Sequence, residues 1–352
     1  MKICFSLSTN GFYRMKYFIN TLKILEMEVT ILNDIPFYET EEEEIYRKTN
    51  KASLSYSSEV LQEINRSDIW LIDLEHRGNH YYFFKSNENL FLNFSGKLIF
   101  YSLDDEGENI RHSVMDKYLL ERVDCFILGN LNPRYALFEY YDKSVLIPRY
   151  ISDYREWYDT FNTIRDRKII FYGLASSIIR IKAVEILKSF GNSFVGGISS
   201  IKAWDKIRNS HYKGNFWDVD EVEYLSSENY TKLLTTSLVS FCPPGLTNWT
   251  YRHIESMAAG CSIISCNLNQ DFDCNFLYRD KVDKLFFYID NNLQNLKEIC
   301  EYCLDNYDIC IEKGREGYGI YQKYFLLTKD QTYNDLVWGD IQLQFLELGI
   351  EI

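Results

Sequence analysis

Short apolar runs alternate with helical patterns along the whole chain, and this alternation starts afresh near its middle. Apolar runs that are separated by helical patterns are typical of parallel strands whose sheet carries helices on both faces. The chain is therefore expected to be an α/β protein with two doubly wound domains. The expected strands span 2–8, 28–32, 68–75, 97–106, 124–129 and 144–150 in the first series, and 168–176, 192–199, 238–242, 261–266 and 284–290 in the second.

The length of the chain supports this division, because 352 residues are more than a single core usually holds. We expect one domain over residues 1–155 and a second over 156–328, followed by a helical segment, 329–352, that returns to the first domain. Two doubly wound domains create a cleft at the carboxyl ends of their strands, and ligands are expected to bind there.

Composition and charge narrow the range of partners. The formal net charge of −13 disfavours a general duplex-binding surface, so no nucleic-acid partner is expected. No apolar stretch is long enough to span a bilayer, and the N-terminus lacks the features of a signal peptide. We therefore expect a cytoplasmic protein, for which peripheral association with a membrane stays open. Cys300 and Cys303 form a C-x-x-C without a second pair or a nearby histidine, which favours buried thiols over a metal site.

The segment PPGLTNWTYRHIESMAAGC, residues 243–261, lies between two expected strands. Its prolines end the first of these strands, and Gly245 lets the backbone approach a ligand closely. Thr247, Asn248 and Thr250 are residue types that cap helices, and a helical composition follows them up to the next glycine. A helix is thus expected to begin at the carboxyl end of a strand, where its free N–H groups suit a phosphate.

Two charged residues lie on one face of this expected helix. Arg252 is in its first turn and can make a bidentate contact with a diphosphate. Glu255 is one turn further on and can accept hydrogen bonds from ribose hydroxyls. The same pattern equally fits an ordinary capped helix with an Arg–Glu pair on its surface, and the residues alone leave both readings open.

The spacing P-G-x-x-x-W-T-x-R-x-x-E-S-x-x-x-G-C, from Pro244 to Cys261, resembles the C-terminal signature of exostosin-type glycosyltransferases. It also resembles, more loosely, the E-x-x-x-x-G signature of the wider GT-B superfamily. The resemblance covers roughly the second half of the chain. It implies two Rossmann-like domains and a nucleotide-diphosphate sugar donor, UDP- or GDP-linked, that acts as a co-substrate without a tightly bound cofactor or a metal.

The resemblance also implies roles for individual residues. Arg252 would neutralise the diphosphate leaving group, and Glu255 would hold the ribose. A second phosphate contact would come from Gly173, which ends the first strand of this half, and from Arg180 on the next helix; a solvated helix face is the alternative for Arg180. The residues expected at the donor site are Gly173, Arg180, Gly245, Thr247, Asn248, Arg252 and Glu255.

The expected stereochemistry follows from one position at which this sequence differs from a group of GT-B enzymes. Retaining enzymes of one large GT-B group carry a second Glu eight residues before the ribose Glu, and Thr247 occupies that position here. This favours an inverting enzyme, which needs a general base for the acceptor hydroxyl. Asp105 is the first candidate, with Asp104 and His76 as further ones, because each lies at the carboxyl end of an expected strand and neighbouring carboxylates raise one another's pKa. A solvated loop is the alternative for each of them.

The sequence therefore predicts a hexosyl- or pentosyltransferase that moves a sugar from a UDP- or GDP-linked donor to a saccharide acceptor, as in polysaccharide biosynthesis. Two alternatives stay open. One is a non-catalytic protein on the same fold that binds a nucleotide or a sugar. The other is a metal-dependent GT-A-like transferase, in which Asp218 and Asp220 would hold a divalent cation.

Overall fold

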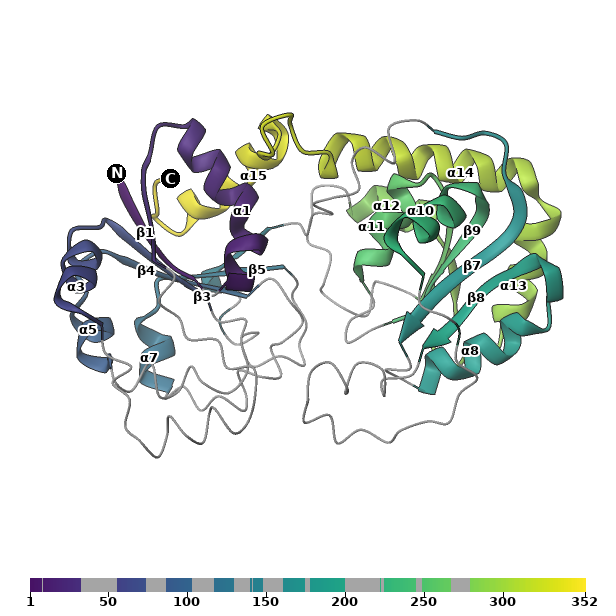
Figure 1. The fold of residues 1–352 in the computed structure, drawn as a ribbon, viewed down its shortest axis with the longest axis horizontal. Helices are drawn as coiled ribbons and strands as arrows, with labels where there is room; N and C mark the ends of the chain where they lie inside the picture. The colour runs from purple at the N-terminus through teal and green to yellow at the C-terminus, as the bar shows by residue number, and fades with distance from the viewer. Residues whose placement is uncertain are drawn as a thin grey trace. The chain divides into compact units, whose positions relative to one another are not determined.

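The computed structural model of the chain describes residues 1–7, 9–32, 56–73, 87–102, 117–129, 140, 142–147, 161–174, 178–199, 222, 225–244, 249–266 and 279–352. The chain divides into two compact units (Figure 1). Unit 1 comprises Met1–Pro148 and Leu327–Ile352, and unit 2 comprises Arg149–Leu326. Each unit contains one sheet whose described strands are all parallel, so the predicted fold class is confirmed.

Unit 1 holds a six-stranded sheet in the order β2–β1–β3–β4–β5–β6. Its strands are β1 (Lys2–Ser6), β2 (Glu28–Leu32), β3 (Ile69–Asp73), β4 (Lys97–Ser102), β5 (Cys125–Leu128) and β6 (Ser144–Leu146). Its described helices are α1 (Thr9–Ile24), α3 (Ser58–Asn65), α5 (Glu88–Asn93), α7 (Lys117–Arg122) and α15 (Asp335–Glu347). The strand order reverses between β1 and β3, as in doubly wound sheets.

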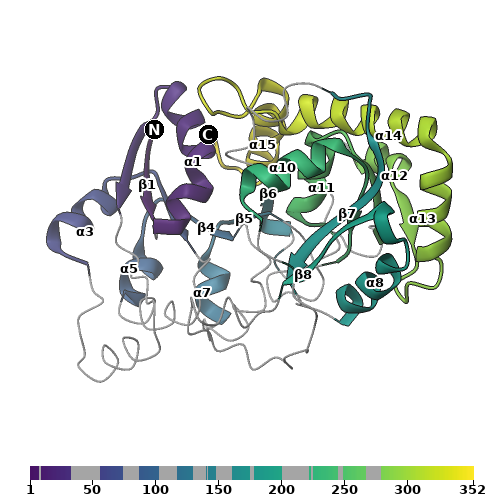
Figure 2. The ribbon, with the colours of Figure 1, turned by 45° about the vertical axis from the view of Figure 1, so that its right-hand side comes forward.

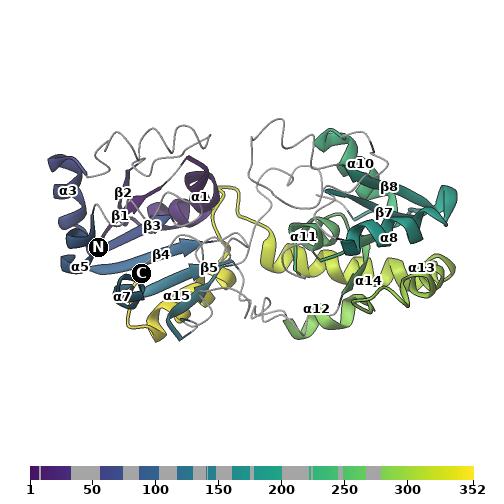
Figure 3. The same cartoon turned by 90° about the horizontal axis from the view of Figure 1, so that it is seen from below.

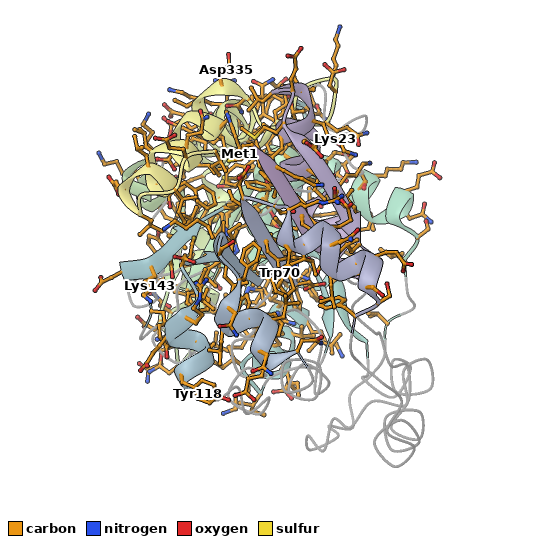
Figure 4. All side chains as sticks on the ribbon, turned by 90° about the vertical axis from the view of Figure 1, so that its left-hand side faces the viewer. Met1, Lys23, Trp70, Tyr118, Lys143 and Asp335 are labelled. Carbon is orange, nitrogen blue, oxygen red and sulfur yellow. The ribbon has the colours of Figure 1, made fainter. Side chains whose placement is uncertain are left out.

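The core of unit 1 is built around Trp70 on β3, whose side chain is fully buried. The Trp70 ring stacks on Phe91 of α5 with centroids 4.8 Å apart, and its Nε1–H donates to Ser6 Oγ of β1 at 2.9 Å. The buried polar end of the indole is therefore satisfied within the sheet. Figure 4 shows Trp70 among the side chains of this unit, with Lys23 and Asp335 at its margin.

The last helix of the chain completes the same core. Phe18 of α1 lies edge-on to Trp338 of α15, with ring centroids 5.7 Å apart, and 6.2 Å from the ring of Phe345. The backbone N–H of Tyr333 donates to Thr21 Oγ1 at 3.1 Å. Segments more than 300 residues apart in the sequence thus share one hydrophobic cluster in unit 1.

Unit 2 holds a five-stranded sheet in the order β11–β10–β9–β7–β8. Its strands are β7 (Asp166–Leu174), β8 (Phe194–Ser199), β9 (Ser237–Cys242), β10 (Ser262–Cys266) and β11 (Phe287–Ile289). Figure 2 shows two of these strands, β7 and β8, side by side. The described helices of unit 2 are α8 (Ile178–Lys188), η3 (Gly191–Ser193), α10 (Ser227–Thr236), α11 (Tyr251–Ala258), α12 (Arg279–Leu285), α13 (Leu296–Asp305), α14 (Tyr307–Ile320) and η6 (Tyr321–Phe325). Every strand expected from the apolar runs is present in the two sheets.

One helix differs from the sequence expectation. The pattern over residues 296–314 predicts a single helix that ends near Gly314, but the structure contains two helices, α13 and α14, divided at Asn306. Asn306 leaves the helical region (φ −106°, ψ 63°), and its side-chain Nδ2–H donates to the Tyr302 carbonyl at 2.8 Å. The second helix continues to Ile320. Gly314 lies inside α14. A glycine is needed at this position because a Cβ would lie 2.3 Å from the Gly260 carbonyl oxygen.

This close contact places α14 against the end of α11, and Figure 3 shows the two helices side by side.

Cys300 and Cys303 of α13 are buried and free, as expected from their spacing on one helical face. In the described part of the chain, no helix is both long and apolar enough to cross a membrane.

Candidate functional site

The candidate site lies at the carboxyl ends of β7 and β9 in unit 2. The chain passes from β7 to β8 on one side and later to β9 on the other, so the strand order reverses between β7 and β9. Open parallel sheets bind their ligands at such a reversal, beyond the carboxyl ends of the strands. The helix α11 follows β9 and brings Arg252 and Glu255 to this edge.

The start of α11 is fixed by an unusual cap. Thr250, one of the three predicted cap residues, is the N-cap, with an extended backbone (φ −130°, ψ 163°). Its N–H donates to Nδ1 of His253 at 3.0 Å, in the place that Glu or Gln takes in most capping boxes. Nε2–H of His253 in turn donates to Ser265 Oγ at 2.8 Å, and the imidazole stacks on Trp249 at 4.9 Å. Burial lowers the pKa of His253 to about 3, so the ring is neutral and holds the helix start in one geometry.

The Arg252 guanidinium is held by main-chain and aromatic groups of β7. Its Nη2–H donates to the Tyr172 carbonyl, and its Cζ lies 4.9 Å from the centroid of the Phe171 ring. Its buried Nε has no hydrogen-bond partner among the described residues, and no described carboxylate forms an ion pair with it. A guanidinium that lies over an aromatic face and keeps a donor unused is prepared for an anionic ligand.

A second guanidinium, that of Arg180 in the first turn of α8, belongs to the same edge. Its Nε–H donates to the Pro244 carbonyl, just beyond β9, at 3.1 Å. Burial, together with the positive charge of Arg252, lowers the pKa of Arg180 to about 9. Arg180 is partly buried, so the solvated helix face considered as an alternative is wrong. An anion that binds both arginines relieves their mutual repulsion.

Glu255 lies one turn after Arg252 and is also partly buried. The Tyr230 hydroxyl of α10 donates to its Oε2 at 3.0 Å. Burial raises the pKa of the Glu255 carboxyl, and the Arg252 charge and the Tyr230 hydrogen bond lower it in part. No ion pair within 4.0 Å joins Arg252 to Glu255 among the described contacts. The alternative of a surface Arg–Glu pair on an ordinary capped helix is therefore wrong.

Gly173 at the end of β7 makes room for the Arg252 guanidinium. A Cβ at this position would lie 2.7 Å from Cζ of the Phe171 ring and 3.5 Å from Arg252 Nη2. A real Cβ essentially never lies as close to a carbon atom as 2.7 Å, so any side chain here must displace the ring on which Arg252 rests.

Gly173→Ala is therefore expected to destabilise unit 2 by about 1–3 kcal/mol through overpacking, and to weaken the binding of inorganic pyrophosphate because the ring under Arg252 is displaced. Isothermal titration calorimetry measures the change in pyrophosphate affinity. Gly319→Ala in α14 is the matched control, since a Cβ there meets nothing within 4 Å. Equal pyrophosphate affinity in the two variants would show that Gly173 does not shape the site.

The structure brings four of the residues predicted from the sequence to one edge of unit 2, namely Gly173, Arg180, Arg252 and Glu255. Gly245, Thr247 and Asn248 of the donor site, the base candidates Asp104, Asp105 and His76, and the metal candidates Asp218 and Asp220 lie outside the described residues. Among the described residues, no three His, Cys, Asp or Glu side chains form a cluster that could hold a metal ion.

Sequence reasoning missed the aromatic residues and the histidine that support this edge. Phe171, Tyr172 and Tyr230 were read only as parts of a strand or a helix, and His253 only as a helical residue. An aromatic residue in a buried strand gives no signal that a guanidinium will lie over it. Tyr230 precedes its partner Glu255 by 25 residues, so no local spacing connects the two.

Comparison with solved structures supports the fold. No family model matches the chain, and no curated protein matches it. An α-glucosyltransferase in complex with UDP-glucose and DNA containing an abasic site is 14% identical and superposes with a TM-score of 0.56 over 92% of this chain and 95% of that one. A sucrose-phosphate synthase from Thermosynechococcus elongatus is 12% identical, with a TM-score of 0.51 over 99% and 98% of the two chains. At these identities the likeness concerns the fold, which is of the GT-B type, with two Rossmann-like α/β domains; the resemblance to the exostosin-type family remains a prediction.

Proposed function

We propose that this chain is a glycosyltransferase that moves a sugar from a nucleotide-diphosphate donor to an acceptor hydroxyl. The observation that carries the proposal is the pair of arginines at the carboxyl edge of the unit 2 sheet. Arg252 and Arg180 converge from two helices, and Arg252 forms no ion pair with any described residue. A diphosphate supplies the two or more negative charges that such a pair of cations binds best.

The proposed chemistry follows from where charge develops. When the bond between the sugar and the diphosphate breaks, the electron pair goes to the phosphate oxygen, and the nucleoside diphosphate leaves with one more negative charge. Guanidinium groups that are already positioned at this oxygen stabilise the transition state more than the ground state. Glu255 accepts hydrogen bonds from the ribose of the same donor. Arg252 and Arg180 thereby supply without a metal the charge stabilisation that a divalent cation gives in other transferases.

The donor and the stereochemistry are parts of the proposal. We place UDP-sugars first and GDP-sugars second, since the similar α-glucosyltransferase has UDP-glucose bound. We propose an inverting reaction in which a group of unit 1 removes the acceptor proton, with Asp105, Asp104 and His76 as its candidates. Thr247, at the position where one group of retaining enzymes has a second Glu, supports this choice.

The acceptor is proposed to be a saccharide. The formal net charge of −13 opposes a polyanionic acceptor, although the similar α-glucosyltransferase structure contains DNA. Saccharides and DNA should therefore be compared as acceptors in the same assay. A short duplex DNA should yield no product above background, whereas a mixture of oligosaccharides should.

Nucleotide release from UDP- and GDP-sugars, with and without these acceptors, tests the proposed function. Acceptor-dependent release that persists in EDTA supports it. Nucleotide binding without release under any condition would indicate a non-catalytic binding protein. Activity that is lost on chelation and in Asp218→Ala, but is kept in Arg252→Ala, would instead support the metal-dependent alternative.

A further inference from the structure

The side chain of Tyr230 connects the two charged groups of the candidate site. It projects from the middle of α10, and its hydroxyl donates to Oε2 of Glu255 at 3.0 Å. Its ring lies edge-on to the ring of Tyr172, with centroids 6.4 Å apart and planes at 86°. The carbonyl of Tyr172 is in turn the acceptor for Arg252. Tyr230 therefore touches both the carboxylate and the strand residue that holds the guanidinium.

We propose that Tyr230 is a positioning residue that orients Glu255 toward the ribose of the nucleotide, and that this pair makes the site select ribonucleotides over deoxyribonucleotides. The inference rests on the proposed function, because it concerns the donor of that reaction. The inference adds to the proposed function a residue from a separate helix, α10. It also adds a substrate selectivity that Arg252 and Arg180 cannot provide, since these two arginines would contact only the phosphates.

The hydrogen-bonding capacity of the carboxylate supports this role. An ionised carboxylate has about four acceptor sites on its two oxygens. Tyr230 occupies one site on Oε2, and it is the only described side chain that donates to Glu255. The remaining sites suit vicinal hydroxyls, each of which can donate one hydrogen bond. A nucleotide whose ribose lacks one hydroxyl leaves part of this acceptor capacity unused in a partly buried position, and this lowers its affinity.

The contribution of Tyr230 is to fix the carboxylate in one orientation before the nucleotide arrives. An unrestrained glutamate side chain loses rotamer freedom on binding, and that loss opposes the new hydrogen bonds. The Tyr230 hydrogen bond also favours the ionised carboxylate, which has more acceptor sites than the protonated acid, against burial that favours the acid. Without the hydroxyl, Glu255 is both less ordered and a poorer acceptor.

A purely structural role for Tyr230 makes a different prediction. If the hydrogen bond only ties α10 to α11, its removal changes the stability of unit 2 and affects every ligand of the site alike. If Tyr230 positions Glu255, its removal lowers the preference between nucleotides that differ in one ribose hydroxyl and leaves the binding of a ligand without ribose unchanged. The ratio of two affinities is therefore the informative quantity.

Calorimetric titration of the full chain with UDP, 2′-deoxy-UDP, GDP, 2′-deoxy-GDP and inorganic pyrophosphate tests this inference. The variants are Tyr230→Phe, Glu255→Gln and the double variant. Tyr302→Phe, which removes the hydroxyl of an exposed tyrosine on α13, is the matched control. We expect the wild type and Tyr302→Phe to prefer the ribonucleotide by about tenfold or more. Tyr230→Phe should lose most of this preference and keep its pyrophosphate affinity, and the double variant should equal Glu255→Gln.

An unchanged ribose preference in Tyr230→Phe would overturn the inference while leaving the proposed function intact. Parallel losses for the nucleotides and for pyrophosphate would overturn it too, since they indicate a structural role. If the wild type binds none of the nucleotides, the proposed function fails and the inference fails with it. Pyrophosphate binding by Tyr230→Phe also reports that the variant is folded at the site, so that a lost preference cannot come from misfolding.

Discussion

Replacing Arg252 with alanine is expected to lower the affinity for UDP by about 100-fold or more, because truncating one member of a desolvated charge pair typically costs about 2–5 kcal/mol. The variant loses the charge that we propose to bind the diphosphate and keeps that of Arg180. The UDP affinity of Arg252→Lys should lie between those of the wild type and Arg252→Ala. Lysine keeps the charge but not the planar group that rests on Phe171 and donates to Tyr172.

Calorimetry with UDP measures these affinities, and turnover of a UDP-sugar measures the effect on the reaction. Arg167→Ala is the matched control, because Arg167 lies near the other end of β7, where its guanidinium donates to the Leu304 carbonyl and lies over Tyr307. We expect Arg167→Ala to bind UDP like the wild type. If Arg252→Ala and Arg167→Ala lose UDP affinity equally, the effect is one of stability, and the assignment of the diphosphate site to Arg252 is wrong.

Acidification is expected to destabilise unit 2 through His253. Burial holds the pKa of the folded imidazole at about 3, whereas the unfolded chain protonates near 6.5. Below pH 6.5 the unfolded state therefore binds a proton that the folded state excludes, so the contribution of His253 is complete above pH 6.5 and is lost as the pH falls toward 3. By pH 4 this loss is on the order of 3 kcal/mol, at about 1.4 kcal/mol per pH unit.

Urea unfolding of the wild type and of His253→Gln between pH 7 and pH 4 checks this expectation. Glutamine can accept from the Thr250 N–H and donate to Ser265 Oγ, as the imidazole does, but it does not titrate. We expect the variant to be less stable at pH 7, since it loses the stacking on Trp249, and to show a shallower decline as the pH falls. Parallel declines in the two proteins would mean that His253 titrates normally in the folded state.

The strands were predictable because each is a short apolar run with a clear boundary. Burial on both faces of a parallel sheet demands such runs, and no distant contact is needed to recognise them. The division of α13 from α14 was not predictable, because the apolar period continues through Asn306 on both sides. Gly314 misled the prediction as a helix stop. It is required instead by the approach of the Gly260 carbonyl, a tertiary contact that outweighs the helix-forming cost of glycine, about 1 kcal/mol.

For the candidate site, the sequence was informative where residues act through local spacing. Arg252 and Glu255 lie three residues apart in one helix, so their common face followed from the helical period, and Thr250 was recognisable as a cap residue. The position of Arg180 beside Arg252 depends on how α8 and α11 meet the same sheet edge, and that depends on the order of β7 and β9. Tyr230 and Phe171 are further still from spacing rules, because their contacts with Glu255 and Arg252 are made only through the fold.

The division of the chain between the two units has a consequence for how the protein is made. Unit 2 is one continuous segment, Arg149–Leu326, whereas unit 1 needs residues from both ends of the chain. During synthesis the sheet of unit 1 is translated first, but the Phe18 cluster lacks Trp338 and Phe345 until α15 leaves the ribosome. Unit 2 has all of its residues before that time. The domain that begins folding first is thus the one completed last, and its apolar surface on α1 stays uncovered while unit 2 is being formed.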